Sequence, residues 1–131
     1  MIIGIGVDIE SPARFRRMMR RPVARRLEVF SPGELRIIEE AADPLVQMTA
    51  AFAFKEAMFK ALGGGWLDSN LFWRDIELLS DLSDRGEIAV RIVGSARARF
   101  HERGGRRIHA ACSASRDVVL AQAILEGEGS G

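Results

Sequence analysis

The sequence of 131 residues contains one cysteine, no tyrosine and only two lysines among its 19 basic residues. The single cysteine, Cys112, excludes an internal disulfide and a zinc site built from several cysteines. The apolar run from Met1 to Val7 has no basic region ahead of it and is too short for a signal peptide or a membrane span. We therefore expect a protein of the reducing cytoplasm that does not associate with a membrane.

Charge is unevenly distributed along the chain, although it nearly cancels in total. The net charge of +1 argues against a general polyanion-binding protein. Seven arginines nevertheless lie between Arg14 and Arg26, with no acidic residue among them. Such a cluster indicates an acidic partner, and Arg14, Arg17 and Arg21 share one face of the helix expected here. Nucleic-acid binding is the least favoured alternative, since Phe15 is the only aromatic residue among these arginines.

Length and composition are those of one ordinary globular domain. The chain is 47% hydrophobic and 28% charged, which is sufficient for a real core and argues against general disorder. We expect a single domain over residues 1–126 and a flexible tail over residues 127–131. Helical patterns dominate the first half and strand patterns the second, so the predicted class is α+β.

The most apolar segment predicts one long helix from Asp43 to Leu62. Asp43 can cap the first turn, Pro44 suits the first helical position, and Gly63 suits the position just after the end. The helix would be about 28 Å long, and its apolar residues on nearly every side predict burial in the core. Three charged residues nevertheless lie on it: Lys55, Glu56 and Lys60.

The remaining elements follow from apolar alternation, capping residues and turn residues. Strands are predicted over residues 2–7, 75–79, 87–93, 107–113 and 118–126. Shorter helices are predicted over residues 12–20, 23–29, 32–41 and 96–103, with caps at Ser11, Ser31 and Ser95. The first strand is expected to be buried, with Gly4 and Gly6 permitting a close approach to another segment.

Four polar residues are candidates for a single site: Asp8, Glu56, Lys60 and His109. Two carboxylates suit Mg²⁺, and a lysine one helical turn away could neutralise charge on a pyrophosphate. The residues alone leave alternatives open, namely a surface ion pair between Glu56 and Lys60 and a purely structural role for His109. The glycine run 63–65 is either a flexible hinge or a place where backbone amides face a phosphate.

Three motifs carry a resemblance to a known family, and they occur in the expected order for a chain of this length. They read Gly4-Ile5-Gly6-Val7-Asp8-Ile9, Phe30-Ser31-Pro32-Gly33-Glu34-Leu35, and Phe52-Ala53-Phe54-Lys55-Glu56-Ala57 followed by Lys60-Ala61. Together they resemble the holo-acyl-carrier-protein synthases, the small 4′-phosphopantetheinyl transferases. The resemblance implies a fold in which a long buried helix packs on a mostly antiparallel sheet.

The same resemblance implies an activity and a role for each candidate residue. The activity is transfer of the phosphopantetheine arm of coenzyme A to a serine of an acyl carrier protein, with release of 3′,5′-ADP, as in fatty acid biosynthesis. A homotrimer with sites between subunits is also implied. The implied catalytic residues are Asp8, Glu56 and Lys60, with Asp8 and Glu56 as Mg²⁺ ligands. The implied coenzyme-binding residues are Lys60, His109, Gly63, Gly64 and Gly65, and the implied carrier-docking residues are Arg14, Arg17 and Arg21.

The chain departs from the family pattern at several positions. Ala111 and Ala114 stand in the last predicted hairpin where the family often has a serine and a further polar residue. Ala51 stands where an arginine is usual, and Ser11 stands where a glutamate is usual, with Glu10 one position earlier. These departures leave open a second hypothesis, a catalytically impaired homologue that binds a carrier protein without modifying it.

Overall fold

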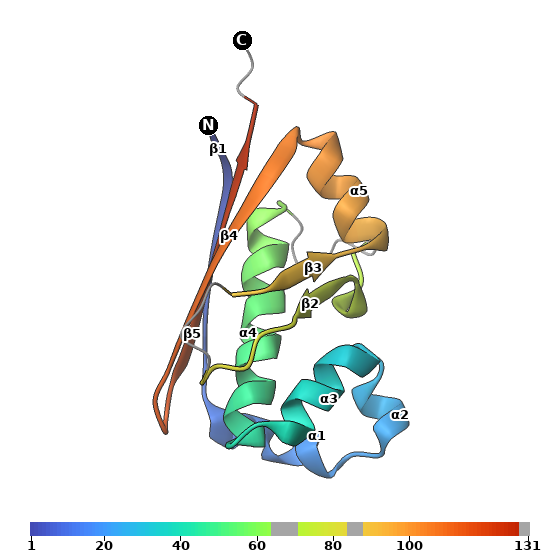
Figure 1. Cartoon of the computed structure of the whole chain (residues 1–131), viewed down its shortest axis with the longest axis vertical. Helices are drawn as coiled ribbons and strands as arrows, with labels where there is room; N and C mark the ends of the chain where they lie inside the picture. The colour runs from blue at the N-terminus through green and yellow to red at the C-terminus, as the bar shows by residue number, and fades with distance from the viewer. Residues whose placement is uncertain (64–70, 84–87, 129–131) are drawn as a thin grey trace.

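The computed structural model describes residues 1–63, 71–83 and 88–128. A three-stranded antiparallel sheet of order β1-β5-β4 forms one layer, and helix α4 packs along its inner face, with the other helices and a separate two-stranded sheet beyond it (Figure 1). The α+β class is therefore confirmed, although the strands form two sheets rather than one. The elements are β1 (Ile2–Glu10), η1 (Pro12–Phe15), α1 (Arg16–Arg20), α2 (Val23–Arg26), α3 (Pro32–Glu40), α4 (Pro44–Ala61), η2 (Trp73–Asp75), β2 (Ile76–Leu78), β3 (Val90–Ile92), α5 (Gly94–Glu102), β4 (Gly105–Ala114) and β5 (Val119–Gly127).

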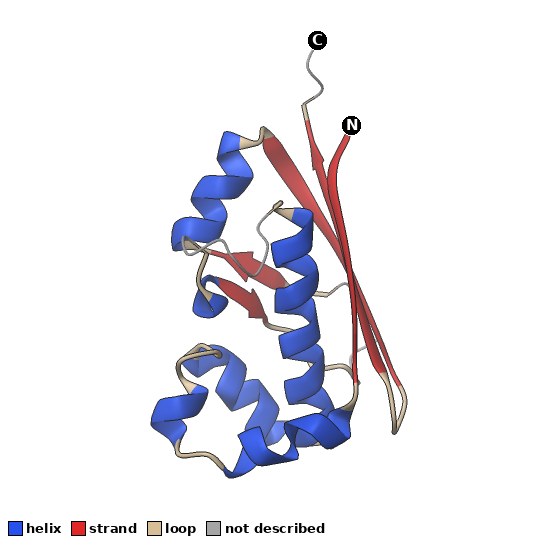
Figure 2. Ribbon diagram, turned by 180° about the vertical axis from the view of Figure 1, so that it is seen from behind, coloured by secondary structure: helices blue, strands red, loops and turns tan. Residues whose placement is uncertain are grey.

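Strand β1 lies at the edge of the larger sheet and is longer than predicted. It pairs with β5 as far as Glu10, so Asp8 and Glu10 belong to the strand rather than to a loop after it. The prediction that this strand is buried is wrong, because α4 covers only one face of the sheet (Figure 2). Alternate side chains therefore point away from the core, and Ile5 and Ile9 are more than half exposed.

The two glycines of β1 allow the strand to lie directly against α4, as predicted. A Cβ on Gly6 would stand 1.7 Å from the carbonyl oxygen of Ala57, and one on Gly4 would stand 2.0 Å from that of Ala61. Any side chain at either position would push the strand away from the helix. These glycines therefore set the spacing between β1 and α4, which carry the candidate site.

Helix α4 is the central element of the core, and both of its predicted ends are confirmed. The Asp43 carboxylate accepts a hydrogen bond of 3.2 Å from the amide of Val46, and Gly63 adopts a left-handed φ of +78° just after the helix. Residues on most sides of the helix are buried, including Met48, Ala53, Phe54, Ala57 and Met58.

Of the three serines predicted to cap the shorter helices, only Ser31 is confirmed as a cap. Ser31 and Glu34 form the full capping box at the start of α3, with side-chain-to-backbone bonds of 3.1 and 3.2 Å. Ser11 makes no capping bond, and the helix expected after it is divided into η1 and α1. Ser95 lies inside α5 rather than at its N-cap, and its hydroxyl donates to Asp75 at 2.6 Å instead.

The final hairpin, β4 and β5, has the predicted facing pattern. On β4, Ile108, Ala110 and Cys112 face the core, while His109 and Ala111 point to the opposite side. Strand β5 continues through Gly127, one residue into the predicted tail. The small sheet of β2 and β3 is shorter than predicted, and residues 84–87 lie outside the described part of the chain.

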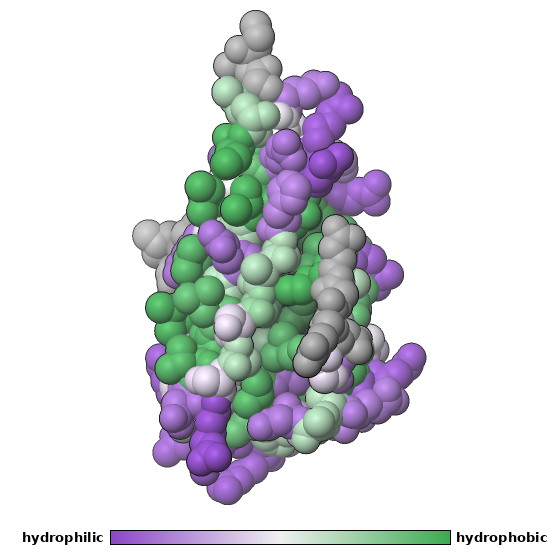
Figure 3. Space-filling model, turned by 60° about the vertical axis from the view of Figure 1, so that its left-hand side comes forward, coloured by the Kyte–Doolittle hydropathy of each residue, from purple (hydrophilic) through white to green (hydrophobic). Residues whose placement is uncertain are grey.

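No described helix covers the outer face of the three-stranded sheet, and the part of this face formed by β1 is apolar. Figure 3 shows hydrophobic residues gathering on this side of the molecule. We call this surface the outer sheet face; its exposed large apolar members are Ile5, Val7, Ile9 and Leu120. Contiguous apolar surface of this kind commonly marks an interaction site. None of the helices within the described residues is both long and apolar enough to cross a membrane.

Candidate functional site

Strand β1 and helix α4 bring two of the predicted carboxylates to one place. Because side chains alternate along a strand, Asp8 lies on the face of β1 that meets α4, and its side chain is 12% exposed. Glu56 points from α4 and is 7% exposed. Coulombic repulsion between Asp8 and Glu56 contributes to raising the pKa of Glu56, so the two carboxylates lie within electrostatic reach of each other.

Lys60 completes this centre from the next turn of α4. Its Nζ donates to the carbonyl oxygen of Val7 at 2.8 Å and to Asp8 Oδ1 at 3.2 Å. The alternative of a helix-surface ion pair with Glu56 is therefore not what the structure shows, since the ion-pair partner of Lys60 is Asp8. The side chain of Lys60 is half exposed and lines the pocket described below.

The carboxylates have properties that fit a hard cation. Asp8 Oδ2 is buried and accepts no hydrogen bond from a donor among the described residues. Burial and the neighbouring Asp8 raise the pKa of Glu56, while Lys60 opposes this shift. A cation between the two side chains would bind the buried oxygen of Asp8 and offset the repulsion between the two carboxylates. Mg²⁺ usually binds one or two carboxylates and takes its other ligands from water and substrate phosphates. No group of three or more His, Cys, Asp or Glu among the described residues is arranged as a metal site.

Glu10 is a residue of this centre that the sequence prediction left out. It lies two positions beyond Asp8 on the same face of β1, and it forms an ion pair of 3.7 Å with Arg14. Burial raises its pKa to about 7, with further contributions from Asp8 and Glu56 and an opposing one from Arg14. Continuing the period-two pattern of the strand beyond Val7 would have placed Glu10 beside Asp8.

A pocket of about 470 Å³ opens over the carboxylates and connects them to the arginine-rich segment. Its wall includes all three arginines predicted to bind a partner, together with an apolar side formed by Phe15, Met18 and Phe52. The lining residues are Asp8, Glu10, Arg14, Phe15, Arg17, Met18, Arg21, Phe52, Glu56 and Lys60. One cavity therefore combines acidic side chains, a lysine and a basic rim.

His109 does not reach this centre within one chain. It points outward from β4 on the outer sheet face, whereas Asp8 points inward from β1. Its Nε2 lies 2.9 Å from Glu126 Oε2, and its side chain is about half exposed. Within the single chain, His109 therefore stabilises the hairpin through a cross-strand contact with Glu126.

The predicted phosphate-binding glycines are only partly described by the structure. Gly63 follows the end of α4, and the side chain of Arg103 lies beside it. Arg103 also donates to the carbonyl oxygens of Ala61 and Ile3, and it thereby joins the end of α4 to β1. Gly64 and Gly65 lie outside the described residues.

Comparison with known proteins identifies the family. The model of the 4′-phosphopantetheinyl transferase superfamily matches residues 4–122, and the chain belongs to this superfamily. A holo-[acyl-carrier-protein] synthase of Cutibacterium acnes is 36% identical over 131 residues, covering 97% of this chain and 100% of that protein. The family recognised from the three sequence motifs is thus confirmed.

Solved structures of the same class have the same fold. The crystal structure of holo-[acyl-carrier-protein] synthase from Neisseria meningitidis superposes with a TM-score of 0.82 at 30% identity, covering 96% of this chain and 99% of that one. A holo-(acyl-carrier-protein) synthase from Bacillus anthracis in complex with CoA (3′,5′-ADP) gives a TM-score of 0.74 at 26% identity, covering 98% and 99%.

Proposed function

We propose that this protein transfers the 4′-phosphopantetheine group of coenzyme A to a serine of an apo acyl carrier protein and releases 3′,5′-ADP. The observation that carries the proposal is the convergence of Asp8, Glu56 and Lys60 in one pocket, in a chain that matches holo-[acyl-carrier-protein] synthases along nearly its whole length. Asp8 is separated from Glu56 and Lys60 by about 50 residues in sequence, and only the fold brings it to them.

The reaction requires that one phosphoester bond form and one pyrophosphate bond break. The serine oxygen attacks the phosphorus that bears the pantetheine arm, and the oxygen of the departing 3′,5′-ADP takes the bonding electron pair. The ammonium group of Lys60 can hold the pyrophosphate oxygens and stabilise the charge that develops on the leaving group. The serine proton passes to a carboxylate or to water at this centre.

Mg²⁺ is the cofactor that the donor set fits best, with Asp8 and Glu56 as its protein ligands. When bound, it would supply Lewis-acid stabilisation of the pyrophosphate charge. Asp8 would present its unpaired Oδ2, while Oδ1 stays oriented by Lys60. Glu56 would remain ionised beside the cation despite the burial that raises its pKa.

The basic rim of the pocket supports docking of an acidic carrier protein. Arg14, Arg17 and Arg21 line the same cavity as the carboxylates. A carrier that binds its acidic surface to these arginines would deliver its serine to the adjacent centre. Complementary charge of this kind accelerates association and sets orientation more than it adds affinity.

A homotrimer is the assembly we propose, and the outer sheet face supports it. The described residues leave that face uncovered in the single chain; its β1 part is apolar, and His109 lies on its β4 part. Association through this face would carry His109 toward the pocket of a neighbouring subunit, where it could contact coenzyme A. The same proposal places the enzyme in the cytoplasm, consistent with its single cysteine.

The decisive experiment incubates the purified protein with coenzyme A, Mg²⁺ and an apo carrier protein, and then weighs the carrier by mass spectrometry. We expect the carrier to gain the mass of one phosphopantetheine, and a carrier with its serine replaced by alanine to gain nothing. No gain with any carrier protein of the same genome would overturn the proposal. Carrier binding that persists without transfer, and that is unchanged in Glu56→Ala, would support the binding-module hypothesis instead.

A further inference from the structure

A fully buried ion pair lies close to the proposed site but outside its pocket. Lys55 Nζ is 2.6 Å from Glu34 Oε1, and both side chains have no exposed surface. Burial lowers the pKa of Lys55 and raises that of Glu34, while their mutual attraction opposes both shifts. A buried pair of this kind often contributes little net stability, so its contribution to function must be sought in what it holds in place.

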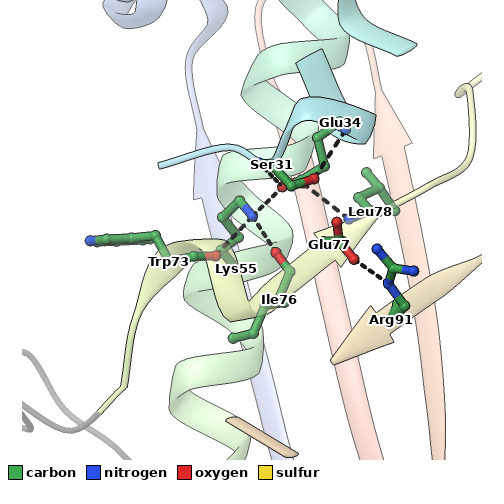
Figure 4. A network of polar contacts seen from close by, with 8 residues as sticks. All are labelled: Ser31, Glu34, Lys55, Trp73, Ile76, Glu77, Leu78 and Arg91. Atoms are coloured by element: carbon green, nitrogen blue, oxygen red, sulfur yellow. Dashed lines mark hydrogen bonds and ion pairs between the residues drawn. The ribbon is translucent and has the colours of Figure 1, made fainter. Parts of the chain in front are cut away.

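The pair joins three separate segments of the chain (Figure 4). Lys55 projects from α4, and Glu34 from the first turn of α3. The ammonium group also donates to the carbonyl oxygen of Trp73 at 2.9 Å and to that of Ile76. Glu34 Oε2 accepts from the amide of Leu78 at 3.1 Å. All three ammonium protons therefore have acceptors, and two of these acceptors are backbone atoms of η2 and β2.

The backbone that Lys55 holds carries the indole ring of Trp73. This ring stacks on Phe52, with 4.9 Å between centroids and 20° between planes. It also meets Phe59 edge-on at a centroid distance of 4.8 Å. Phe52 in turn contacts Phe15 at 4.8 Å. Trp73 therefore packs against the aromatic side chains that flank Glu56 and Lys60 on α4.

The stack ends in the pocket wall. Phe52 and Phe15 both line the pocket that contains Asp8 and Glu56. Phe52 lies four residues before Glu56, so the two side chains share one face of α4. A displacement of the indole ring would free Phe52 to change its rotamer and alter the wall next to Glu56. Small displacements near a reacting centre can lower its rate considerably.

We propose that Lys55 is a positioning residue, which fixes Trp73 against Phe52 through the buried contact with Glu34 and so shapes the wall of the pocket. The proposal rests on the proposed function for its kinetic consequences, but not for its structural ones. It assigns Lys55 no contact with a substrate. The influence of Lys55 on the reaction passes through the indole ring of Trp73.

The test uses a Trp66→Phe background, in which Trp73 is the only tryptophan and its fluorescence reports its own environment. We expect Lys55→Met to shift the Trp73 emission to longer wavelength and to lower kcat/KM about tenfold. Trp73→Ala should lower kcat/KM by a similar factor. The double variant Lys55→Met with Trp73→Ala should lose about tenfold in kcat/KM rather than a hundredfold. The losses should not multiply, because both substitutions remove the same support of Phe52.

Two further variants separate positioning from loss of stability. Glu34→Gln combined with Lys55→Met removes the pair without leaving an unpaired buried charge, and the emission shift should persist in this folded protein. Gln47→Met is the matched control, because Gln47 is also buried on α4 but bonds to Ser80 and Leu82 away from the aromatic stack. It should leave the Trp73 emission and kcat/KM unchanged.

An unshifted emission in the folded Lys55 variants, or independent losses that multiply in the double variant, would overturn the positioning role. Failure of the proposed function gives a different result. A parent protein that transfers nothing would overturn the transferase assignment, and the emission of Trp73 would still decide whether Lys55 holds the ring in place.

Discussion

Lys60 Nζ lies 3.2 Å from Asp8 Oδ1, although 52 residues separate the lysine from the aspartate. The same ammonium group holds the carbonyl oxygen of Val7 at 2.8 Å. The contact orients the Asp8 carboxylate so that one oxygen is bound, while the other, Oδ2, is buried and accepts no hydrogen bond from a donor within the described parts of the chain. An oriented carboxylate with a free oxygen is the arrangement that a metal site requires of its ligand.

Replacing a single carboxylate of the centre should abolish most of the activity. Glu56→Gln keeps the shape of the side chain but removes its charge, and we expect kcat to fall about 100-fold or more. Calorimetry should show weaker Mg²⁺ binding by the variant in the absence of substrate. Glu40→Gln, an exposed change on α3, is the control and should match the parent in both measurements. An unchanged Mg²⁺ affinity in Glu56→Gln would exclude this residue as a ligand.

Replacing Lys60 should affect the reaction much more than the fold. The ion pair with Asp8 is partly exposed, so its loss should change stability by only about 1 kcal/mol or less. We expect Lys60→Met to lower kcat about 100-fold, because the charge on the leaving group is no longer offset. Lys60→Arg retains the charge with a different geometry, so its kcat should lie between those of the parent and Lys60→Met. Steady-state kinetics and thermal melts measure both effects, and a normal kcat in Lys60→Met would contradict this role.

Sequence patterns predicted the parts of this structure that depend on neighbouring residues. The capping box at Ser31 and the start of α4 at Asp43 follow from local hydrogen-bonding chemistry, and both are confirmed. Ser95 failed as a cap because its hydroxyl bonds to Asp75, which is 20 residues away. Glu10 was missed because the strand was predicted to end at Val7, whereas pairing with β5 extends it through Glu10.

The geometry of the candidate site likewise depends on contacts between segments that are distant in sequence. Residue type alone nominated Asp8, Glu56 and Lys60, but their meeting depends on β1 packing against α4 across its two glycines. The surroundings of His109 depend on what covers the outer sheet face, and no local pattern encodes that. The family resemblance supplied the expectation in both cases, because it carries the information of a whole fold.

The raised pKa of Glu10 predicts a characteristic pH dependence of stability. Its value of about 7 in the folded protein exceeds the ordinary 4.5, so folding favours the protonated form. Glu10 therefore contributes stability that is complete below pH 4.5 and is lost as the pH rises through 7. As the pH rises from 4.5 to 8 without divalent cations, the parent should lose stability that Glu10→Gln keeps. The unfolding free energy of the variant should therefore rise by about 1–3 kcal/mol relative to that of the parent over this range. Urea unfolding over this range measures the gain, and a difference independent of pH would contradict the shift.

Charge reversal on the basic rim should weaken carrier binding without slowing the chemical step. Arg17→Glu and Arg21→Glu should each raise KM for the carrier about tenfold, with kcat nearly unchanged at saturation. Added salt should reduce the difference from the parent, because it screens the attraction that the variants lack. Arg36→Glu, an exposed reversal on α3 outside the pocket, is the control. Equal effects at all three positions would show that only the total charge matters.

The outer sheet face should determine the assembly. Ile5 is 56% exposed there and lies on the same strand as Asp8, so a charge at this position would be buried in any association through the sheet. A symmetric trimer repeats such a substitution at every interface, and each copy would cost several kcal/mol. We therefore expect the parent to run as a trimer in size-exclusion chromatography with light scattering, and Ile5→Asp to run as a monomer with an unchanged circular dichroism spectrum.

The control for this change is Phe72→Asp, which removes an apolar side chain that is similarly exposed but lies just before η2 and not on the outer sheet face. It should remain trimeric, because general surface hydrophobicity does not drive the association. If sites lie between subunits, the Ile5→Asp monomer should also lose transfer activity, and the activity should depend on protein concentration when association is only weakened. A fully active monomer would show that one chain holds a complete site, and His109 would then have only its structural contact with Glu126.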